Sequence, residues 1–287
     1  MLLGLARWRG TRVVWTIHDL GSNDQLHPRL ERMFWSAFVP RVDGFICLTE
    51  GGRRDALERF PELAGRPSAV IPHGHYLDAY PSGIGRGAAR AQLGLDPDGP
   101  VVLHFGLIRP YKNVPHLVSV FRQAAIPGAV LVIGGRPFDD NVEREVRAAA
   151  EGATGVRLDL RFIGSDEVQA YFEAADLVVL PYSHVTNSGA IFLALSFRRP
   201  VLVPDLGAMG EHARDFGADW VSLYRGTLES ADLAAAVLWA RETERGPLDM
   251  SPLAWDEIAR QTRRLYRRVT EDPTGGETGS VADEDRR

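Results

Sequence analysis

Residues 101–113 read VVLHFGLIRPYKN, an apolar run that ends in glycine and leads into a loop with two cations. The run Val101 to Phe105 is rich in β-branched and aromatic residues, which indicates a strand buried in a parallel sheet. The loop behind it carries Lys112, the only lysine among the 33 basic residues of this 287-residue sequence. A compact ammonium suits a loop that grips phosphate oxygens, so we interpret Lys112 as an anion-binding residue at a strand end.

The alternation of strand and helix patterns continues on both sides of this run. Short β-branched stretches alternate with amphipathic stretches, as in parallel sheets whose strands are joined by helical crossovers. In the first part of the chain the predicted strands are 13–17, 44–48 and 69–71, with helices at 28–39 and 52–60. In the second part the predicted strands are 101–105, 129–133, 158–163, 177–180 and 201–203, each followed by a helical pattern. The sequence therefore predicts an α/β protein whose second sheet is doubly wound.

Glycine, proline and histidine cluster at 72–87, where no periodicity survives, so we place a linker there. We expect a first α/β domain with this linker at 1–85 and a second at 86–246. A separate helix is predicted at 247–270, with charged residues on its solvated face. The acidic, glycine-rich segment 271–287 has no apolar anchors, and we expect it to be disordered.

Charge and composition exclude several classes of protein. The net charge is -5, and six acids against two arginines in residues 271–287 supply -4 of it, so the body is near neutral. Nucleic acid is therefore not an expected partner. The single cysteine, Cys47, allows no disulfide within the chain, and no apolar stretch approaches the roughly 18 residues of a membrane span. The start Met1 to Ala6 is too short for a secretory core, and we expect a cytoplasmic protein.

Two loops at predicted strand ends are suited to bind an anion. In the first, Gly106, Arg109 and Lys112 place two cations near the end of a strand, enough to neutralise a diphosphate. The second, at 181–190, is polar, and its Ser188-Gly189 opens a helix whose free N–H groups favour phosphate oxygens. Neither a GxxxxGK[ST] nor a GxGxxG motif is present. Together the loops indicate an activated, diphosphate-linked ligand.

These loops and strand ends resemble the nucleotide-sugar domain of GT-B glycosyltransferases, most of all family 4 of that group. The resemblance extends over about 13–240 and rests on Phe105-Gly106, Lys112-Asn113, Phe162-Ile163-Gly164, Ala175 to Pro181 and Arg199-Pro200-Val201. It implies two Rossmann-like domains facing a cleft. The N-terminal half would hold the acceptor, and the C-terminal half a nucleoside-diphosphate sugar, with no metal and no cofactor besides this donor substrate.

Some residues of the family match this sequence by position. Lys112 matches the lysine that binds the diphosphate, and Gly106 matches the glycine before it. The family's arginine usually follows that glycine directly, where this chain has Leu107, and Arg109 is the expected substitute. Glu211 falls where the family has an acid after a glycine loop, although it also suits a helix cap.

The paired glutamates of the family, spaced E-x7-E, are absent. Their positions are taken by Val185 and Leu193. In the family these carboxylates hold the sugar hydroxyls and the ribose. Asn187 and Ser188, next to Gly189, are the polar residues placed to compensate.

His18-Asp19 follows the first predicted strand. The resemblance identifies His18 with the family's strand-end histidine, and an imidazole with a carboxylate neighbour can take a proton, so we predict His18 and Asp19 as catalytic residues. The alternative is that His18 is a structural residue, whose ring nitrogens are hydrogen-bonded within the protein. His73-Gly74-His75 is similar to the family's segment between its domains, and we interpret it as a hinge rather than a metal site.

The first domain and its linker together span about 85 residues, roughly half of the usual number in such enzymes, so we expect the chain to begin inside the acceptor domain. The predicted helix 28–38 places aromatic residues beside arginines. Such a stripe is usually core, and contact with a lipid-linked acceptor at the inner face of the membrane is the alternative.

We therefore predict a metal-independent glycosyltransferase that moves a sugar from a nucleoside-diphosphate sugar to a glycan or lipid-linked acceptor, in polysaccharide or glycolipid synthesis. Two alternatives stay open: a nucleotide-sugar epimerase with Asp19 and Glu211 as its acid and base, and a non-catalytic module that binds sugar nucleotides or a protein. The missing glutamates favour the second of these.

Overall fold

The computed structural model describes residues 8–20 and 28–271, which form two compact units. Within the described residues, the first unit contains the chain up to Pro72 and the helix from Asp256 onward, and the second extends from His73 to Trp255. The sequence analysis placed the boundary between the two domains after residue 85, whereas the second unit begins at His73. Most of the predicted tail, 272–287, lies outside the described residues.

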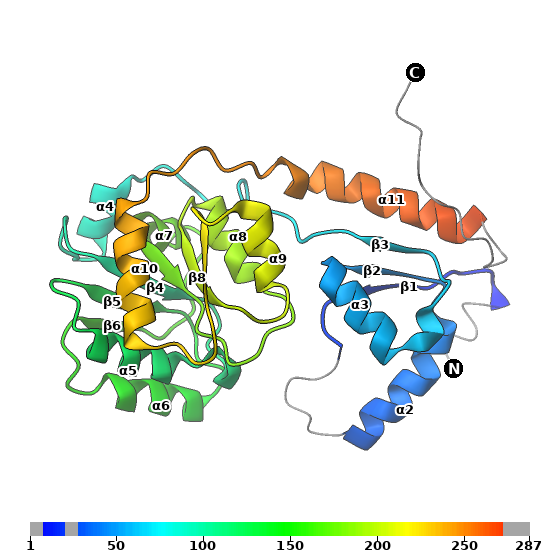
Figure 1. The fold of residues 1–287 in the computed structure, drawn as a ribbon, viewed down its shortest axis with the longest axis horizontal. Helices are drawn as coiled ribbons and strands as arrows, with labels where there is room; N and C mark the ends of the chain where they lie inside the picture. The colour runs from blue at the N-terminus through cyan, green and yellow to red at the C-terminus, as the bar shows by residue number, and fades with distance from the viewer. Residues whose placement is uncertain (1–7, 21–27, 272–287) are drawn as a thin grey trace. The chain divides into compact units, whose positions relative to one another are not determined.

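The second unit is built on a six-stranded parallel sheet (Figure 1). Its strands are β4 (Val101–Phe105), β5 (Val130–Gly134), β6 (Val156–Asp159), β7 (Leu177–Val179), β8 (Val201–Pro204) and β9 (Val221–Tyr224). They lie in the order β6-β5-β4-β7-β8-β9. The chain thus winds from β4 towards one edge and from β7 towards the other, as in a doubly wound Rossmann fold.

Two layers of helices cover this sheet and explain why its strands are almost wholly apolar. One face packs against α4 (Arg86–Gln92), α7 (Val168–Ala174), α8 (Gly189–Ser196) and α9 (Met209–Phe216). The other packs against α5 (Val114–Ala124), α6 (Asp140–Ala150) and α10 (Ser230–Glu242). All residues of β4, β7 and β8 are buried, since both faces of a central strand lie under helices.

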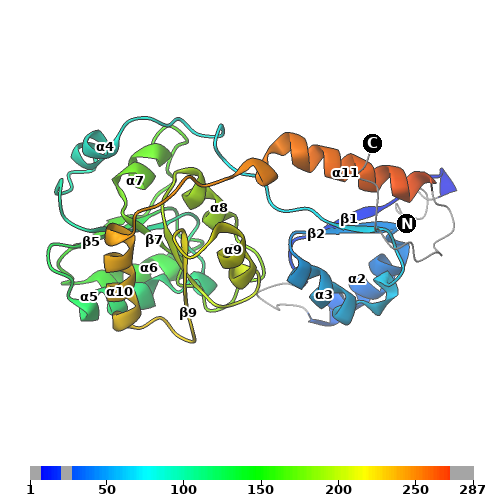
Figure 2. The same ribbon diagram turned by 45° about the horizontal axis from the view of Figure 1, so that its top comes forward.

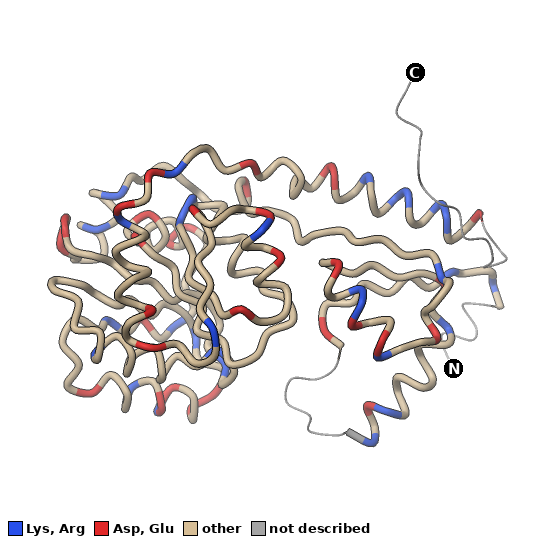
Figure 3. Tube along the Cα trace, in the orientation of Figure 1, with Lys and Arg blue, Asp and Glu red and all other residues tan. Residues whose placement is uncertain are grey.

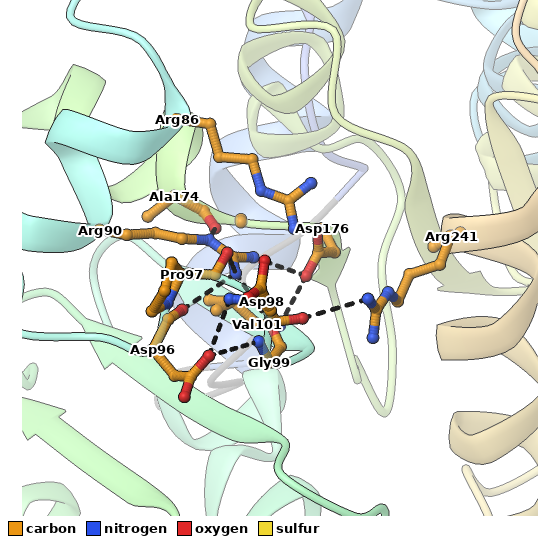
Figure 4. Close-up of polar contacts among 12 residues, drawn as sticks. Arg86, Arg90, Asp96, Pro97, Asp98, Gly99, Val101, Ala174, Asp176 and Arg241 are labelled. Carbon is orange, nitrogen blue, oxygen red and sulfur yellow. Dashed lines mark hydrogen bonds and ion pairs between the residues drawn. The ribbon is translucent and has the colours of Figure 1, made fainter.

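A buried arginine fixes the amino-terminal end of this sheet (Figure 4). Arg90 of α4 is 1% exposed and donates to the carbonyl oxygens of Pro97 and Gly99 and to the carboxylate of Asp176, each at 2.8 Å. The same carboxylate accepts from the amide of Val101, the first residue of β4, at 2.8 Å. A buried ion pair is stable only when its remaining donors and acceptors are satisfied, as they are here. The starts of β4 and β7 are therefore held together, at the end of the sheet away from the predicted anion-binding loops.

The first unit has a smaller parallel sheet in the order β1-β2-β3. Its elements are β1 (Val14–Ile17), α2 (Pro28–Phe38), η1 (Val39–Arg41), β2 (Gly44–Cys47), α3 (Glu50–Arg59), η2 (Pro61–Leu63), β3 (Ser68–Val70) and α11 (Trp255–Glu271). Side chains of β2 alternate between two cores, because Phe45 and Cys47 pack towards α2 and α3 while Ile46 packs towards α11. Figure 2 shows α11 on one side of this sheet and α2 and α3 on the other.

Two Rossmann-like α/β units were predicted, and both are present. Their facing across a cleft stays a prediction. The predicted strand bounds agree with the structure to within a residue except at β6, and β9 was not predicted. β6 was predicted at 158–163, but the chain leaves the sheet after Asp159, where Arg161 turns to bind Asp159 (2.9 Å) and Glu167 (2.5 Å). β9 was missed because it is an edge strand whose Ser222 and Leu223 are not buried.

The C-terminal helix is part of the first unit rather than a separate element. Leu265 and Val269 of α11 are buried, and they pack with Ile258 on one face of the small sheet. Tyr266, the next residue after Leu265, is 49% exposed. The rest of the helix carries basic residues along its length (Figure 3).

Candidate functional site

The two predicted anion-binding loops meet at the centre of the large sheet. They follow β4 and β7, which are hydrogen-bonded neighbours although two further strands lie between them in sequence. In open α/β sheets, ligands bind outside the carboxyl ends of the strands where the winding reverses, because the two neighbouring loops diverge there. A direct contact joins the loops: Ser183 donates its amide (2.9 Å) and its hydroxyl (3.1 Å) to the carbonyl oxygen of Tyr111.

The loop after β4 is shaped by a close approach of two backbones. A Cβ at Gly135 would lie 2.1 Å from the carbonyl oxygen of Gly106, so only glycine fits at position 135. Gly106 itself has φ 115, a conformation that favours glycine. Ile108 continues the pairing, because its amide donates to the Arg136 carbonyl at 2.9 Å. The loop therefore continues the hydrogen bonding of the sheet as far as Ile108. It then forms η3 (Pro110–Lys112), from which the Lys112 side chain returns to Gly106.

Lys112 is a half-buried cation that lacks a carboxylate. Its Nζ lies 5.5 Å from the centroid of the Tyr182 ring, and a Cβ at Gly106 would lie 3.6 Å from it. No carboxylate in the described part of the chain forms an ion pair with it. Burial, and secondly the positive charge of Arg109, lower the pKa of Lys112 from 10.5 to about 8. A group in this state gains from any anion that binds beside it.

The loop after β7 ends at the start of α8. Ser188 occupies the N-cap position but does not accept a hydrogen bond from the helix; its hydroxyl instead lies 3.4 Å from the hydroxyl of Tyr182. The first amides of α8 are therefore without a side-chain cap, next to Gly189. Asn187 precedes them and is half-buried. Tyr182 thus contacts both Lys112 and Ser188, the residue before the first turn of α8.

The other two predicted donor-binding residues lie further out on the same edge of the sheet. The guanidinium of Arg109 lies 4.5 Å from the centroid of the exposed Phe138 ring, so it is held over that ring. Glu211 is half-buried in the first turn of α9. The loop before α9 contacts the second anion loop, because the amide of Ala208 donates to the Thr186 carbonyl at 3.1 Å.

His18 and Asp19 lie in the first unit, directly after β1, and both are exposed. The large sheet brings together Gly106, Lys112, Ser188 and Gly189, whereas His18 and Asp19 belong to the other unit. Their predicted catalytic role stays a prediction.

The sequence analysis missed three residues of this site. Tyr111 and Tyr182 stand in the two quoted loops, and their ring centroids lie 5.8 Å apart, so they join the loops beneath Lys112. His104, within β4, is fully buried; its Nδ1 lies 3.0 Å from the Val179 carbonyl oxygen. Burial, and secondly Lys112, lower the pKa of His104 to about 3, so it is neutral. A lone histidine inside an apolar strand was the available signal.

Among residues 8–20 and 28–271, no three metal-ligating side chains lie close enough together to hold an ion. The helices of the same residues include none with the length and apolar character needed to cross a bilayer.

Comparison with known proteins agrees with this geometry. Residues 99–241 match the family model described as glycosyl transferases group 1. The chain is 35% identical over 198 residues to the GDP-mannose:glycolipid 4-beta-D-mannosyltransferase of Xanthomonas campestris pv. campestris, covering 69% of this chain and 54% of that protein. It is 25% identical over 276 residues to the alpha-maltose-1-phosphate synthase of Mycolicibacterium smegmatis, covering 89% of this chain and 70% of that protein.

Among solved structures, the sucrose-phosphate synthase from Thermosynechococcus elongatus has the same fold, with a TM-score of 0.71 at 21% identity over 93% of this chain and 71% of that chain. The present chain spans 54% of the mannosyltransferase that it matches. The matched family model, the relatives and the doubly wound sheet agree, and the chain therefore belongs to the GT-B glycosyltransferases, with its glycosyl transferases group 1 domain at residues 99–241.

Proposed function

We propose that this chain transfers a glycosyl group from a nucleoside-diphosphate sugar to a glycan or lipid-linked acceptor. The observation that carries the proposal is Lys112, a half-buried ammonium without a carboxylate, placed at the centre of the large sheet near the uncapped start of α8. A diphosphate supplies the negative charge that this arrangement lacks. The ammonium and the helix amides stabilise the charge that develops on the departing phosphate.

In the proposed reaction the bond between the anomeric carbon and the phosphate oxygen breaks, and its electron pair leaves with the nucleoside diphosphate. The acceptor hydroxyl forms the new bond to the anomeric carbon and loses its proton to a base. We assign this base to His18 or Asp19, in keeping with their position after β1. The reaction as proposed uses no metal and no cofactor.

The donor is the first property to test. The relatives that are 35% identical to this chain are named as GDP-mannose enzymes, so GDP-mannose heads a panel of GDP, UDP, ADP and TDP sugars. Stabilisation of the protein against heat by one class of diphosphate identifies the nucleobase of the donor. We expect Lys112→Ala to remove most of that thermal stabilisation, and this variant is the control that the donor binds at this site.

Three outcomes separate the candidate functions. Release of nucleoside diphosphate that depends on an added acceptor supports glycosyl transfer. Conversion of the sugar without an acceptor supports an epimerase. Tight binding without either reaction supports a non-catalytic module, an alternative favoured by Val185 and Leu193 at the positions of the family's glutamates.

We further propose that α2 contacts an anionic membrane surface. Trp35 of this helix packs inward on Trp15, with ring centroids 5.0 Å apart. By contrast, Leu30, Met33 and Phe34 are 63%, 68% and 54% exposed, and Leu30 lies one helical turn before the other two. Exposed apolar side chains beside arginines are typical of helices that lie in the lipid headgroup region.

Sedimentation with vesicles that contain phosphatidylglycerol at low salt tests this contact. We expect binding that the double substitution Met33→Ser and Phe34→Ser abolishes, while Leu238→Ser, at an exposed apolar residue of α10, leaves it intact. Equal sedimentation of all three proteins would refute it.

A further inference from the structure

The segment that joins the first unit to the second is fixed along α8. The amide of Tyr76 donates to the hydroxyl of Ser196, at the end of α8, at 2.9 Å. The ring of His73 stacks on Phe192, in the middle of α8, with centroids 5.4 Å apart and an interplanar angle of 9°. The amide of His75 donates to the Leu253 carbonyl at 3.0 Å. Residues 73–76 are therefore part of the second unit, although the sequence suggested only a hinge.

The side chains of His73 and Tyr76 reach the start of the same helix. A Cβ at Gly189, the first residue of α8, would lie 3.1 Å from the hydroxyl of Tyr76 and 3.5 Å from Nε2 of His73. An alanine at position 189 would push the Tyr76 hydroxyl away and would be in ordinary contact with the His73 ring. Glycine at this position thus lets a phenol and an imidazole lie directly beside the uncapped amides.

The two side chains are hydrogen-bonded to one another in a defined sense. Nδ1 of His73 lies 2.7 Å from the carbonyl oxygen of Gly74, which can only accept, so Nδ1 carries the proton. Nε2 is then an acceptor, and the Tyr76 hydroxyl lies 3.5 Å from it. Because the phenol hydrogen is directed to the imidazole, the lone pairs of the phenol oxygen remain available to accept a hydrogen bond. Such an oxygen accepts from a hydroxyl group.

This chemistry matches a gap in the donor site. The positions of the family's glutamates hold Val185 and Leu193, neither of which can accept a hydrogen bond from a sugar. Tyr182 contacts both Lys112 and Ser188, and the next residue, Gly189, lies beside the phenol of Tyr76. The proposed diphosphate site and this acceptor therefore lie at the start of the same helix. The phenol of Tyr76, hydrogen-bonded to His73, is an acceptor beside Gly189 and can serve in place of a carboxylate.

Resting on the proposed function, we propose that Tyr76, oriented by His73, accepts a hydrogen bond from a hydroxyl of the donor's sugar while the diphosphate binds at Lys112 and the start of α8. Tyr76 is then a binding residue for the sugar and His73 a positioning residue. Neither contributes to holding the diphosphate. The donor is thereby recognised in two separable parts.

The test compares two ligands on the same variants by isothermal titration calorimetry: the nucleoside-diphosphate sugar that stabilises the wild type, and the bare nucleoside diphosphate. Tyr76→Phe removes only the phenol oxygen, and we expect it to weaken the sugar nucleotide by about five- to tenfold and the bare diphosphate by less than about twofold. His73→Phe keeps the stacking on Phe192 and is expected to show the same difference in a smaller amount.

Two controls set the limits of this result. Tyr80→Phe, whose ring centroid lies 6.1 Å from that of Tyr76, is expected to bind both ligands as the wild type does. Lys112→Ala is expected to weaken both ligands equally. Thermal unfolding of each variant checks that it is folded, and Gly189→Ala provides a second route to displacing the phenol.

The outcomes are distinguishable. If the wild type binds no nucleoside-diphosphate sugar, the proposed function fails and this assignment fails with it. If the wild type binds and Tyr76→Phe and Gly189→Ala retain full affinity for the sugar nucleotide, only the assignment of Tyr76 is wrong.

Discussion

Replacement of Lys112 by methionine is expected to stabilise the free protein while it destroys donor binding. The lowering of the Lys112 pKa from 10.5 to about 8 corresponds to an unfavourable free energy of about 3 kcal/mol for the charged form in the folded state. Methionine occupies a similar volume without that charge. It loses the contact of the ammonium with the Tyr182 ring, which contributes roughly 0.5–1 kcal/mol. With allowance for screening by solvent, we expect Lys112→Met to raise the free energy of unfolding by about 1–2 kcal/mol at pH 7.

The pH dependence of this gain has a definite sign. Because the folded pKa of Lys112 lies below its unfolded value, the unfolded chain binds more protons between about pH 8 and pH 10.5. The wild type therefore gains stability relative to Lys112→Met as the pH rises through this range. The difference between the two proteins is largest below pH 8 and vanishes above pH 10.5.

Urea unfolding at pH 7 and pH 9.5 measures these differences, and titration with the donor found in the sugar panel measures binding. Loss of a charge-assisted contact to a diphosphate is expected to weaken binding about 10- to 100-fold. Arg122→Met, at an exposed cation on α5, is the matched control and should change neither quantity. A Lys112→Met protein that is less stable than the wild type at pH 7 would refute the reasoning, because the ammonium would then have a compensating partner.

Three further predictions concern other parts of the molecule. His18→Ala should bind the donor with unchanged affinity and transfer sugar at least tenfold more slowly, since a positioned base contributes about 10²- to 10⁴-fold; normal transfer would remove His18 from the reaction. Arg90→Leu should lower the free energy of unfolding, measured in urea, by about 3–5 kcal/mol, because it removes the buried donor of the Asp176 carboxylate and of the Pro97 and Gly99 carbonyl oxygens, whereas Arg86→Leu, which removes the 45% exposed partner of the same carboxylate, should cost less than about 1 kcal/mol. Gly135→Ala should lower both the melting temperature and the donor affinity, while Gly87→Ala, where a Cβ meets nothing within 4 Å, should raise the melting temperature; equal effects would contradict the close approach at position 135.

Local pattern was sufficient to predict most of the fold. Val101 to Phe105 and Val201 to Val203 are apolar at every position except His104, so they fit only a strand covered on both faces. β9 was missed for the converse reason, since Ser222 and Leu223 at a sheet edge need no burial. α11 shows the same limit. Its apolar face was visible in the sequence, but the surface that this face covers is made by β1, β2 and β3, more than 180 residues away in the chain.

The candidate site divides in the same way. The loops after β4 and β7 and the residues Lys112, Ser188 and Gly189 could be proposed from the sequence, because glycine and polar residues directly after buried strands predict ligand-binding loops. Their neighbours were not identifiable. Tyr182 beneath Lys112, and Tyr76 beside Gly189, are aromatic residues in polar segments, with no pattern that distinguishes them from packing residues.

The sequence by itself determined that this chain forms parallel α/β units and that a single ammonium follows a central strand, because periodicity and residue type act over a few neighbouring positions. Only the tertiary structure decided that this ammonium is half-buried without a carboxylate and that His73 and Tyr76 lie at the start of α8. Burial and pairing are properties of side chains that are distant in sequence, since the winding of the sheet brings β4 beside β7 and carries residues 73–76 along α8. The unpaired charge of Lys112 and the contact of Gly189 with Tyr76 and His73 can therefore be recognised only in the folded structure.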